Sequence, residues 1–308
     1  RNAPIPIRGF GTAGTAIRVR LDEEIRQTKI RKDGRWQVRF PKRSASDKGI
    51  ALILEEKVGK KEFVQIISLQ DIVIGDLWIC AGQSNMEMGL DMVEGGREAA
   101  KTADDPMLRL LMQEKASSPI PRKSVPLQWK KSSSQTILDR GWGGFSALAW
   151  WFGKNLREEL NIPIGIVLAA YGGASIHPFI LPTSPLKGIS KKTKKEMTGY
   201  VQEYNLAEKK FKEKLASLPG EQIGEKEAGE KHTFSSFNEY NTLKIGSAWM
   251  AMLSPLGKMP AKGFTWYQGE SDSAKPETYS DKMKLLRRQN QMFFSTKNFI
   301  FVQIAPWT

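Results

Sequence analysis

The sequence is poor in the two residue types that most often build metal and redox sites. It has one cysteine, Cys80, and two histidines, His177 and His232, among 308 residues. A single cysteine excludes a disulfide within the chain, and its apolar neighbours favour a core position over a redox role. The histidines lie far apart and no Cys/His cluster accompanies them, so we expect no metal site.

Long hydrophobic runs are also absent. No apolar stretch of the sequence reaches the roughly 18 residues that a membrane-spanning helix needs, so we expect no membrane span. The chain begins at Arg1 without a charged and apolar leader. We interpret it as a processed or truncated segment that no longer carries any targeting signal it had.

Acidic residues are the minority among the charges. The sequence has 47 Lys and Arg against 33 Asp and Glu, a net charge of +14, and such an excess can indicate a nucleic-acid-binding protein. The basic residues are spread along the chain, however, with one dense run at residues 191–195, and no nucleic-acid motif accompanies them. We therefore expect a solvated basic surface or an attraction to acidic glycans, and no specific nucleic-acid partner.

Residues 1–72 predict a small antiparallel β-sandwich, an accessory domain that is incomplete in this chain. Short segments rich in β-branched and aromatic residues alternate there with turn signals such as Lys32-Asp33-Gly34. The predicted strands are residues 5–10, 16–21, 36–40, 50–54 and 63–69. No nucleophile, acid and base are clustered in this region, so we expect its role to be structural.

Residues 73–308 predict an α/β domain with a parallel sheet and helices on both faces, because strand and helix patterns alternate. The predicted strands are residues 76–81, 108–113, 164–170, 263–267 and 298–304, and the predicted helices are residues 92–102, 145–160, 240–253 and 277–294. A Lys- and Glu-rich segment at about 184–237, with a helix over 192–218, is expected to be a surface insertion. Ligands of parallel sheets bind beyond the carboxyl ends of the strands.

The first unusual loop at such a strand end is Gly82-Gln83-Ser84-Asn85-Met86. A serine between a strand and a helix can project its hydroxyl from the sheet edge, and its backbone N–H can help to hold an oxyanion. The segment is not the Gly-x-Ser-x-Gly elbow of other hydrolases, because Met86 replaces the second glycine. The alternative is that Ser84 simply caps the helix.

Two further loops follow the strands at 164–170 and 263–267. Gly172 and Gly173 allow a sharp turn and a close approach to a ligand, with a plain tight turn as the alternative. The third loop, Gln268 to Asp272, offers a side-chain amide as oxyanion donor together with the carboxylates of Glu270 and Asp272. Its alternative is a solvated loop.

Together these loops resemble the sialate O-acetylesterase family of the SGNH (GDSL-like) hydrolase superfamily. Residues 76–88 resemble the nucleophile block of that family, residues 165–173 its second block and residues 261–271 its third. Residues 301–307 match the strand that follows, and the order and spacing of the blocks agree. The resemblance runs from the N-terminal strands to the last residue and implies an SGNH-hydrolase-like (flavodoxin-like) sheet.

The resemblance also implies roles for individual residues. Ser84 is expected to attack an acetyl carbonyl, and the N–H groups of Ser84 and Gly173 with the amide of Gln268 are expected to form the oxyanion hole. Glu270 is expected to orient the catalytic histidine, as the equivalent glutamate does in related acetylxylan esterases. The expected mechanism passes through an acetyl-serine and requires no cofactor. Candidate substrate contacts are Gln83, Asn85, His177 and Asp272, with Asn85 and Glu87 also expected to shape the loop.

The general base is where the sequence departs from the family. The family takes its histidine from an Asp-x-x-His-Pro block, which is absent from a chain that stops at Thr308. We expect that the chain is a fragment and that the base lies beyond Thr308, so the segment alone should be nearly inactive. The alternative is that His177, just after the Gly pair, is a substitute base. His232, in the charged insertion, is expected to be solvated.

The expected function is therefore a carbohydrate O-acetylesterase, acting on acetylated sugars or polysaccharides by way of Ser84. The alternative from another class is a non-catalytic glycan-binding protein that keeps the pocket without the base. A nucleic-acid binder driven by the positive charge is a third possibility, and it predicts steep salt dependence with indifference to Ser84. The family's glycan substrates imply a periplasmic or extracellular location, whereas the oligomeric state and the particular sugar are left open.

Overall fold

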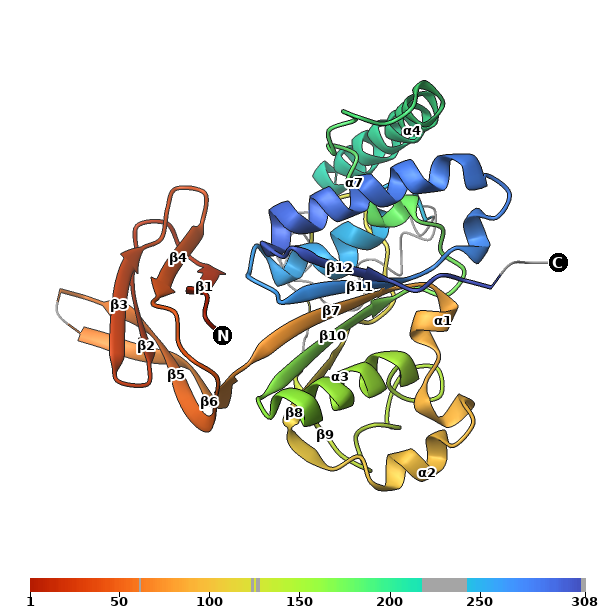
Figure 1. Ribbon diagram of the computed structural model, residues 1–308. Helices are drawn as coiled ribbons and strands as arrows, with labels where there is room; N and C mark the ends of the chain where they lie inside the picture. Colours follow the sequence, from red (N-terminus) through yellow and green to blue (C-terminus); the bar gives the residue numbers. More distant parts are fainter. Residues whose placement is uncertain (61, 123–124, 126–127, 218–242, 306–308) are drawn as a thin grey trace. The chain divides into compact units, whose positions relative to one another are not determined.

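A computed structural model describes residues 1–60, 62–122, 125, 128–217 and 243–305 (Figure 1). The chain divides into two compact units. The first comprises Arg1–Asp76 with Leu156–Gly165, and the second comprises Leu77–Asn155 with Ile166–Thr308. Within the described residues, no helix is both long enough and apolar enough to cross a bilayer.

The first unit holds two antiparallel sheets. One pairs β1 (Ile5–Phe10) with β4 (Arg35–Phe40), and the other has the order β3 (Glu24–Lys29), β2 (Ala16–Leu21), β5 (Ser46–Val58), β6 (Glu62–Ile74). Alternate residues of β2 are buried, as the period of a strand requires. They share one core with Trp36, Val38 and Phe40 of β4, which confirms the predicted sandwich.

Two details of this sandwich differ from the prediction. Strand β3 was missed because its sequence, Glu-Ile-Arg-Gln-Thr-Lys, is largely polar; as the edge of its sheet it buries little. Strands β5 and β6 extend over 13 residues each, well beyond the predicted 50–54 and 63–69. Their long antiparallel pairing extends β5 into polar residues such as Ser46–Gly49, which carry no strand signal of their own.

The second unit is built on a six-stranded mixed sheet. Its order is β12 (Asn298–Phe301), β11 (Gly263–Tyr267), β7 (Asp76–Gly82), β10 (Ile164–Ala170), β8 (Asp105–Met112), β9 (Lys130–Ser132). Strand β11 runs parallel to both β7 and β12. The expected all-parallel sheet is corrected at one edge, where the short polar strand β9 pairs antiparallel with β8.

Helices lie on both faces of this sheet, as predicted. Figure 1 shows α3 (Ala147–Leu160) on one face and α7 (Pro276–Phe294) on the other. The charged helix of the insertion is α4 (Lys191–Ala216), which packs beside α7. Residues 218–237 of the predicted insertion, including His232, lie outside the described residues.

Two predicted helices are replaced by shorter ones. Residues 92–102 do not form a single helix: a 3-10 turn at Leu90–Met92 is followed by α2 (Gly96–Lys101), separated by Gly95 with a left-handed φ of 70°. In place of the predicted helix at 240–253, the described residues form a π-helical turn at Trp249–Leu253 and a 3-10 turn at Ser254–Leu256. Residues 249–253 are buried, as their apolar side chains indicate, but the sequence did not predict that they form a π-helical turn.

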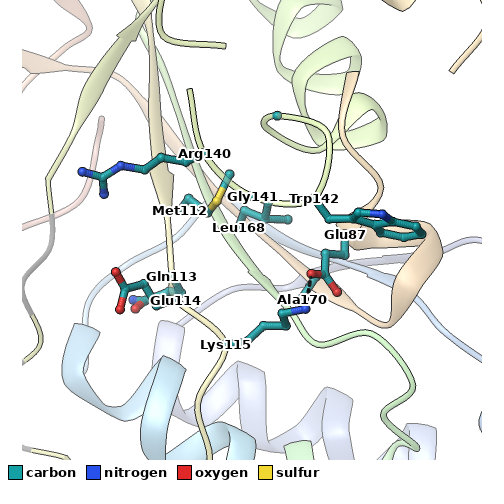
Figure 2. A pocket seen from close by; sticks show the side chains of 11 residues that line it. Glu87, Met112, Gln113, Glu114, Lys115, Arg140, Gly141, Trp142, Leu168 and Ala170 are labelled. Carbon is teal, nitrogen blue, oxygen red and sulfur yellow. Dashed lines mark ion pairs between the residues drawn. The ribbon is translucent and has the colours of Figure 1, made fainter. Parts of the chain in front are cut away.

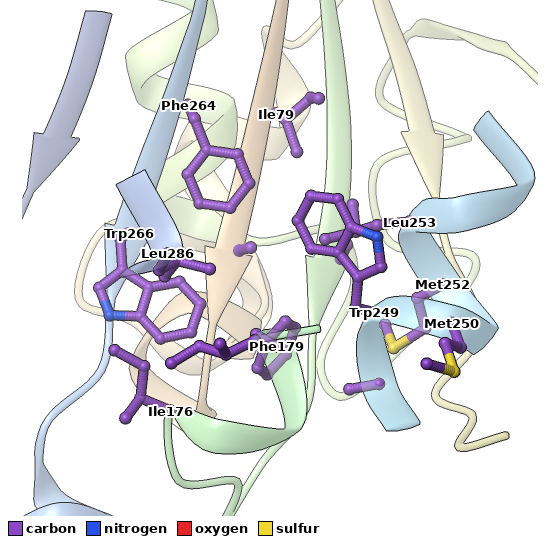
Figure 3. Packing of buried hydrophobic residues seen from close by; sticks show 14 of the residues in the cluster. Ile79, Ile176, Phe179, Trp249, Met250, Met252, Leu253, Phe264, Trp266 and Leu286 are labelled. Atoms are coloured by element: carbon purple, nitrogen blue, oxygen red, sulfur yellow. The ribbon is translucent and has the colours of Figure 1, made fainter. Parts of the chain in front are cut away.

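The core of the second unit is rich in large aromatic side chains. Figure 3 shows Trp249, Phe179, Trp266 and Phe264 gathered beside Ile79 of β7, all of them buried. The rings of Phe179 and Trp266 meet edge to face with centroids 5.1 Å apart. This packing anchors the segments that leave the carboxyl ends of β10 and β11.

Cys80 lies in the same sheet and is fully buried. Burial raises the pKa of its thiol to about 12, so the thiolate is not formed at neutral pH. This confirms the predicted core position of Cys80.

Candidate active site

The three loops singled out in the sequence meet at one edge of the sheet. Parallel pairing sets Tyr267, the last residue of β11, opposite Gly82, the last residue of β7. Backbone bonds then join the loops: the N–H of Gln83 donates to the carbonyl of Tyr267 at 3.1 Å, and the N–H of Tyr171 donates to the carbonyl of Gly82 at 2.9 Å. The strand ends therefore bring together residues that are far apart in the chain.

Gly82 is where the first and third loops come closest. Its φ of 152° is rarely adopted by residues with a side chain, and a Cβ at this position would lie 2.0 Å from the carbonyl oxygen of Tyr267. Only glycine permits the turn that brings Ser84 to the edge of the sheet.

Ser84 is the first residue of α1 (Ser84–Glu87) and is half-buried. The capping position belongs to Gln83, which makes no side-chain cap, so the alternative of Ser84 as a helix cap is excluded. Among the described residues, neither the hydroxyl nor the backbone N–H of Ser84 has a hydrogen-bond partner. Both groups are available to a ligand.

Gln83 was predicted to contact substrate, and the structure gives it a different task. Its side chain is buried, and its Oε1 accepts from the N–H groups of Gly269 and Ser271 at 3.4 and 3.3 Å. Gln83 thus ties the serine loop to the third loop from inside the protein.

Glu270 and Asn85 lie against each other. The Nδ2 of Asn85 donates to Oε1 of Glu270. The other carboxylate oxygen, Oε2, is buried and has no hydrogen-bond partner among the described residues. A buried acceptor without a partner is costly and uncommon, so it marks a place where a donor is expected.

Gln268 does not present a free donor in this structure, which corrects its predicted place in the oxyanion hole. Its Nε2 donates to Oδ2 of Asp272 at 2.8 Å and to the carbonyl of Ala174 at 3.3 Å, and these two bonds use both amide hydrogens. Its Oε1 accepts from the hydroxyl of Tyr279 at 2.8 Å. The side chain crosslinks the second and third loops.

Asp272 is likewise internal and does not face a substrate. It is 7% exposed, and its Oδ2 also accepts from the N–H of Ile176 at 2.8 Å. Its Oδ1 lies 3.5 Å from Nζ of Lys282, whose side chain is 1% exposed. The same Nζ donates to Oε1 of Glu196, on α4, at 3.1 Å. This buried cluster, Asp272–Lys282–Glu196, joins the third loop to α7 and α4.

His177 has both ring nitrogens occupied. Nδ1 lies 2.8 Å from Oγ of Ser175, and Nε2 lies 3.2 Å from the carbonyl of Leu243. Because a carbonyl only accepts, Nε2 carries the hydrogen and Nδ1 accepts from the serine. The ring stacks on Tyr200 with centroids 4.3 Å apart. His177 therefore offers no free nitrogen to Ser84, which corrects its assignment as substrate contact or substitute base.

The second loop presents one free backbone donor beside the serine loop. Gly173 is exposed with φ of 76°, and no described group accepts from its N–H. Its neighbour Gly172 donates to Oε2 of Glu87 at 2.7 Å, and Oε1 of Glu87 forms an ion pair with Lys115 at 2.7 Å. Glu87, expected to shape the loop, holds the glycine turn in place.

A cavity of about 450 Å³ adjoins these loops (Figure 2). Glu87 and Ala170 form part of its wall, next in sequence to the serine loop and the glycine turn, although Ser84 itself does not line it. Trp142 and Arg140 complete another side. Sequence reasoning missed these two; the glycines on either side of Trp142 were the available signal. Within the described part of the chain, no group of three or more His, Cys, Asp or Glu side chains is arranged to hold a metal ion.

Comparison with known proteins finds relatives among the carbohydrate esterases. Residues 74–218 match a family model described as carbohydrate esterase, sialic acid-specific acetylesterase. The sialate O-acetylesterase of Homo sapiens is 27% identical over 281 residues, covering 86% of this chain and 45% of that protein. The Mus musculus enzyme is 25% identical over 279 residues, covering 87% and 48%. The chain thus spans a little under half the length of these relatives.

A solved structure shares the fold. A carbohydrate acetylesterase from Xanthomonas citri superposes with a TM-score of 0.73 at 24% identity, covering 99% of this chain and 57% of that one. The family model and the relatives show that the chain is similar to the sialate O-acetylesterases among the carbohydrate esterases.

Proposed function

We propose that this chain carries the nucleophile of a carbohydrate O-acetylesterase, with Ser84 as the attacking residue. The observation that carries the proposal is the position of Ser84: an unpartnered, half-buried hydroxyl at the junction of three strand-end loops. The relatives named sialate O-acetylesterase support acetyl esters of sugars as the substrate class.

Two backbone N–H groups are the proposed oxyanion donors. Those of Ser84 and Gly173 have no acceptor among the described residues, and donors fixed in a rigid backbone stabilise a developing oxyanion without reorganising. Gln268 supports this site indirectly, because its bonds to Ala174 and Asp272 hold the loop that carries Gly173.

Glu270 is proposed to orient the general base. Its buried Oε2 lacks a partner, and the N–H of an imidazole is the donor that a catalytic carboxylate usually holds. Since His177 is fully engaged, the histidine is proposed to come from outside the described residues. Asn85 fixes the other oxygen, so the free one keeps a defined direction.

The proposed reaction has two steps. The base takes the hydroxyl proton while Oγ of Ser84 forms a bond to the acetyl carbon. The sugar oxygen leaves with the proton that the base returns to it, and acetyl-serine remains. Water then loses a proton to the base, attacks the acetyl carbon and releases acetate, while Oγ regains a proton. A sugar hydroxyl and acetate are the products.

The proposal also covers the substrate and the cellular location of the protein. The substrate is an acetylated sugar or polysaccharide, and we propose export to the periplasm or the cell exterior, where such glycans are met. A role as a non-catalytic glycan-binding protein is the second candidate, since no described histidine is bonded to Ser84 or Glu270.

The experiment compares Ser84→Ala with Ser273→Ala in the protein that contains this chain, using release of 4-nitrophenol from 4-nitrophenyl acetate. Ser273 is an exposed serine near the same edge of the sheet. We expect Ser84→Ala to lower the rate by a factor of about 10³ or more and Ser273→Ala to keep it. Equal rates in the two variants would end the serine-esterase proposal, and an inactive parent protein would favour the glycan-binding candidate.

A further inference from the structure

The cavity beside the candidate active site has the features of a binding site rather than of a packing gap. It lies where β8 and β10 end, and its volume of about 450 Å³ falls within the range of small-ligand pockets. One wall is Glu87, whose carboxylate bonds the N–H of Gly172. Glu87 thus lines the cavity and contacts the glycine turn, so a ligand held there lies close to the candidate active site.

Trp142 gives the cavity an aromatic surface. Its side chain is 43% exposed although it lines the cavity, and Figure 2 shows its indole beside the Glu87 carboxylate. An indole exposed in this way presents a flat apolar face, to which the C–H face of a sugar ring is complementary.

The loop that carries Trp142 is held in place by the segment that follows the serine. The carbonyl of Trp142 accepts from the N–H of Gly89, and that of Gly143 accepts from the N–H of Asp91, both at 2.9 Å. Gly143 has φ of 75°, and a Cβ there would lie 2.3 Å from Cγ of Met92. The backbone that carries the indole is therefore held against the segment that follows α1, as a positioned binding surface requires.

The polar groups of the wall suit hydroxyl groups. Gln113 is 5% exposed and lines the cavity, and its Nε2 has no hydrogen-bond partner among the described residues. A buried donor without a partner is costly, and an oxygen of a bound ligand would supply the missing acceptor. The carboxylate of Glu87 retains acceptor capacity for a hydroxyl donor.

The charges of the wall cancel. Two acidic side chains, Glu87 and Glu114, face two basic ones, Lys115 and Arg140. Glu87 and Lys115 are already paired at 2.7 Å, and Figure 2 shows Arg140 at the end of the cavity away from Trp142. A wall without net charge does not select an anion, in contrast to the chain as a whole, whose net charge is +14.

Resting on the proposed esterase function, we propose that this cavity binds an uncharged sugar ring of the acetylated substrate. The ring stacks on Trp142, its hydroxyls bond to Gln113 and Glu87, and its acetyl group is directed toward Ser84. The substrate class is thus a neutral acetylated glycoside, rather than one whose recognition depends on a sugar carboxylate.

The test measures binding in a Ser84→Ala background, so that the ester is not consumed and the result does not depend on catalysis. The probes are a singly O-acetylated methyl glucoside and an O-acetylated N-acetylneuraminic acid, measured by calorimetry. We expect the glucoside to bind more tightly than the anionic sugar. We expect Trp142→Ala to weaken glucoside binding about tenfold and Trp142→Phe to restore most of it.

Trp129 provides the matched control. It is 46% exposed and does not line the cavity, so Trp129→Ala should bind the glucoside as the parent does. Tighter binding of the anionic sugar, equal binding by the Trp142→Ala and Trp129→Ala variants, or no binding of either probe would each overturn the proposal. These outcomes leave the esterase function intact, because that function is tested by Ser84 in turnover.

Discussion

Asn85, the residue after the candidate nucleophile, donates its side-chain amide to Glu270, which lies 185 residues later in the chain. The bond fixes one oxygen of the carboxylate and leaves Oε2 buried without a described partner. This contact thus fixes the direction in which Glu270 can hold a histidine, while the bonds of Gln83 also join the two loops.

Replacement of Asn85 should therefore reduce turnover more than binding. In Asn85→Leu, Glu270 loses its fixed orientation, and a displacement of about 1 Å in a catalytic group costs about a hundredfold in rate. We expect kcat for 4-nitrophenyl acetate to fall by about that factor with KM nearly unchanged. Asn85→Asp should be worse, because two carboxylates would then face each other. A change confined to KM would show that Asn85 contacts substrate instead.

Replacing the buried Lys282 should destabilise the protein much more than replacing the exposed Lys275, although both lie near Glu196. Lys282 has a side chain that is 1% exposed, whereas that of Lys275 is 60% exposed, and both lie near Oε1 of Glu196. Lys282→Met leaves the buried carboxylate of Asp272 without its counter-charge, at a cost of about 3–5 kcal/mol in the free energy of unfolding. Lys275→Met should cost less than about 1 kcal/mol. Similar losses in urea unfolding would show that the cluster is not the source of stability.

Replacing Gly82, at the start of the serine loop, should destabilise the protein more than replacing Gly95. Gly82→Ala adds a Cβ 2.0 Å from the carbonyl oxygen of Tyr267, whereas Gly95→Ala, at φ of 70°, meets nothing within 4 Å. Gly95→Ala should therefore cost only the backbone strain, about 1–2 kcal/mol. Gly82→Ala should cost more than that and abolish esterase activity, because the first and third loops must separate. Thermal unfolding and turnover measured on both variants test this, and an active Gly82→Ala protein would refute it.

Protonation of His177 should lower the stability of the folded protein in acid. Burial lowers its pKa below the ordinary 6.5, with Lys282 acting in the same direction and Asp272 and Glu196 opposing. The unfolded chain then binds the proton first as the pH falls. The contribution to stability is complete above about pH 6.5 and is lost as the pH falls through the folded pKa, with a slope of at most about 1.4 kcal/mol per pH unit.

His177→Gln should flatten this dependence. Thermal unfolding of the parent and the variant between about pH 7 and pH 5 compares the two slopes directly. Parallel curves would mean that protonation of other groups causes the acid sensitivity.

The sequence predicted the strands of the sheet other than β9 and the meeting of the three loops, because these follow from local patterns. Buried strands read as apolar runs, and glycines mark the turns at their ends, as at Gly82 and Gly173. Parallel strands then place their carboxyl ends at one edge. Residues such as Ser84 and Glu270 are carried to that edge with them.

The partners of the polar side chains could not be predicted in the same way. Gln268 and Asp272 were expected to face a ligand, but they bond to each other and to neighbouring loops. Lys282 lies on a helix whose sequence suggests an exposed charge, and it is buried. Which of several donors an acceptor meets depends on tertiary distances that no local pattern encodes. The cavity wall around Trp142 was missed for the same reason.

The most direct test of the account is covalent labelling of Ser84. A fluorophosphonate forms a stable bond to a serine that is activated as a nucleophile, and peptide mass spectrometry locates the adduct. The account predicts a single adduct on the peptide containing Ser84, slowed by an O-acetylated methyl glucoside and absent from the Ser84→Ala variant. A protein that hydrolyses acetyl esters while Ser84 stays unlabelled, or that carries the adduct on another serine, would contradict it.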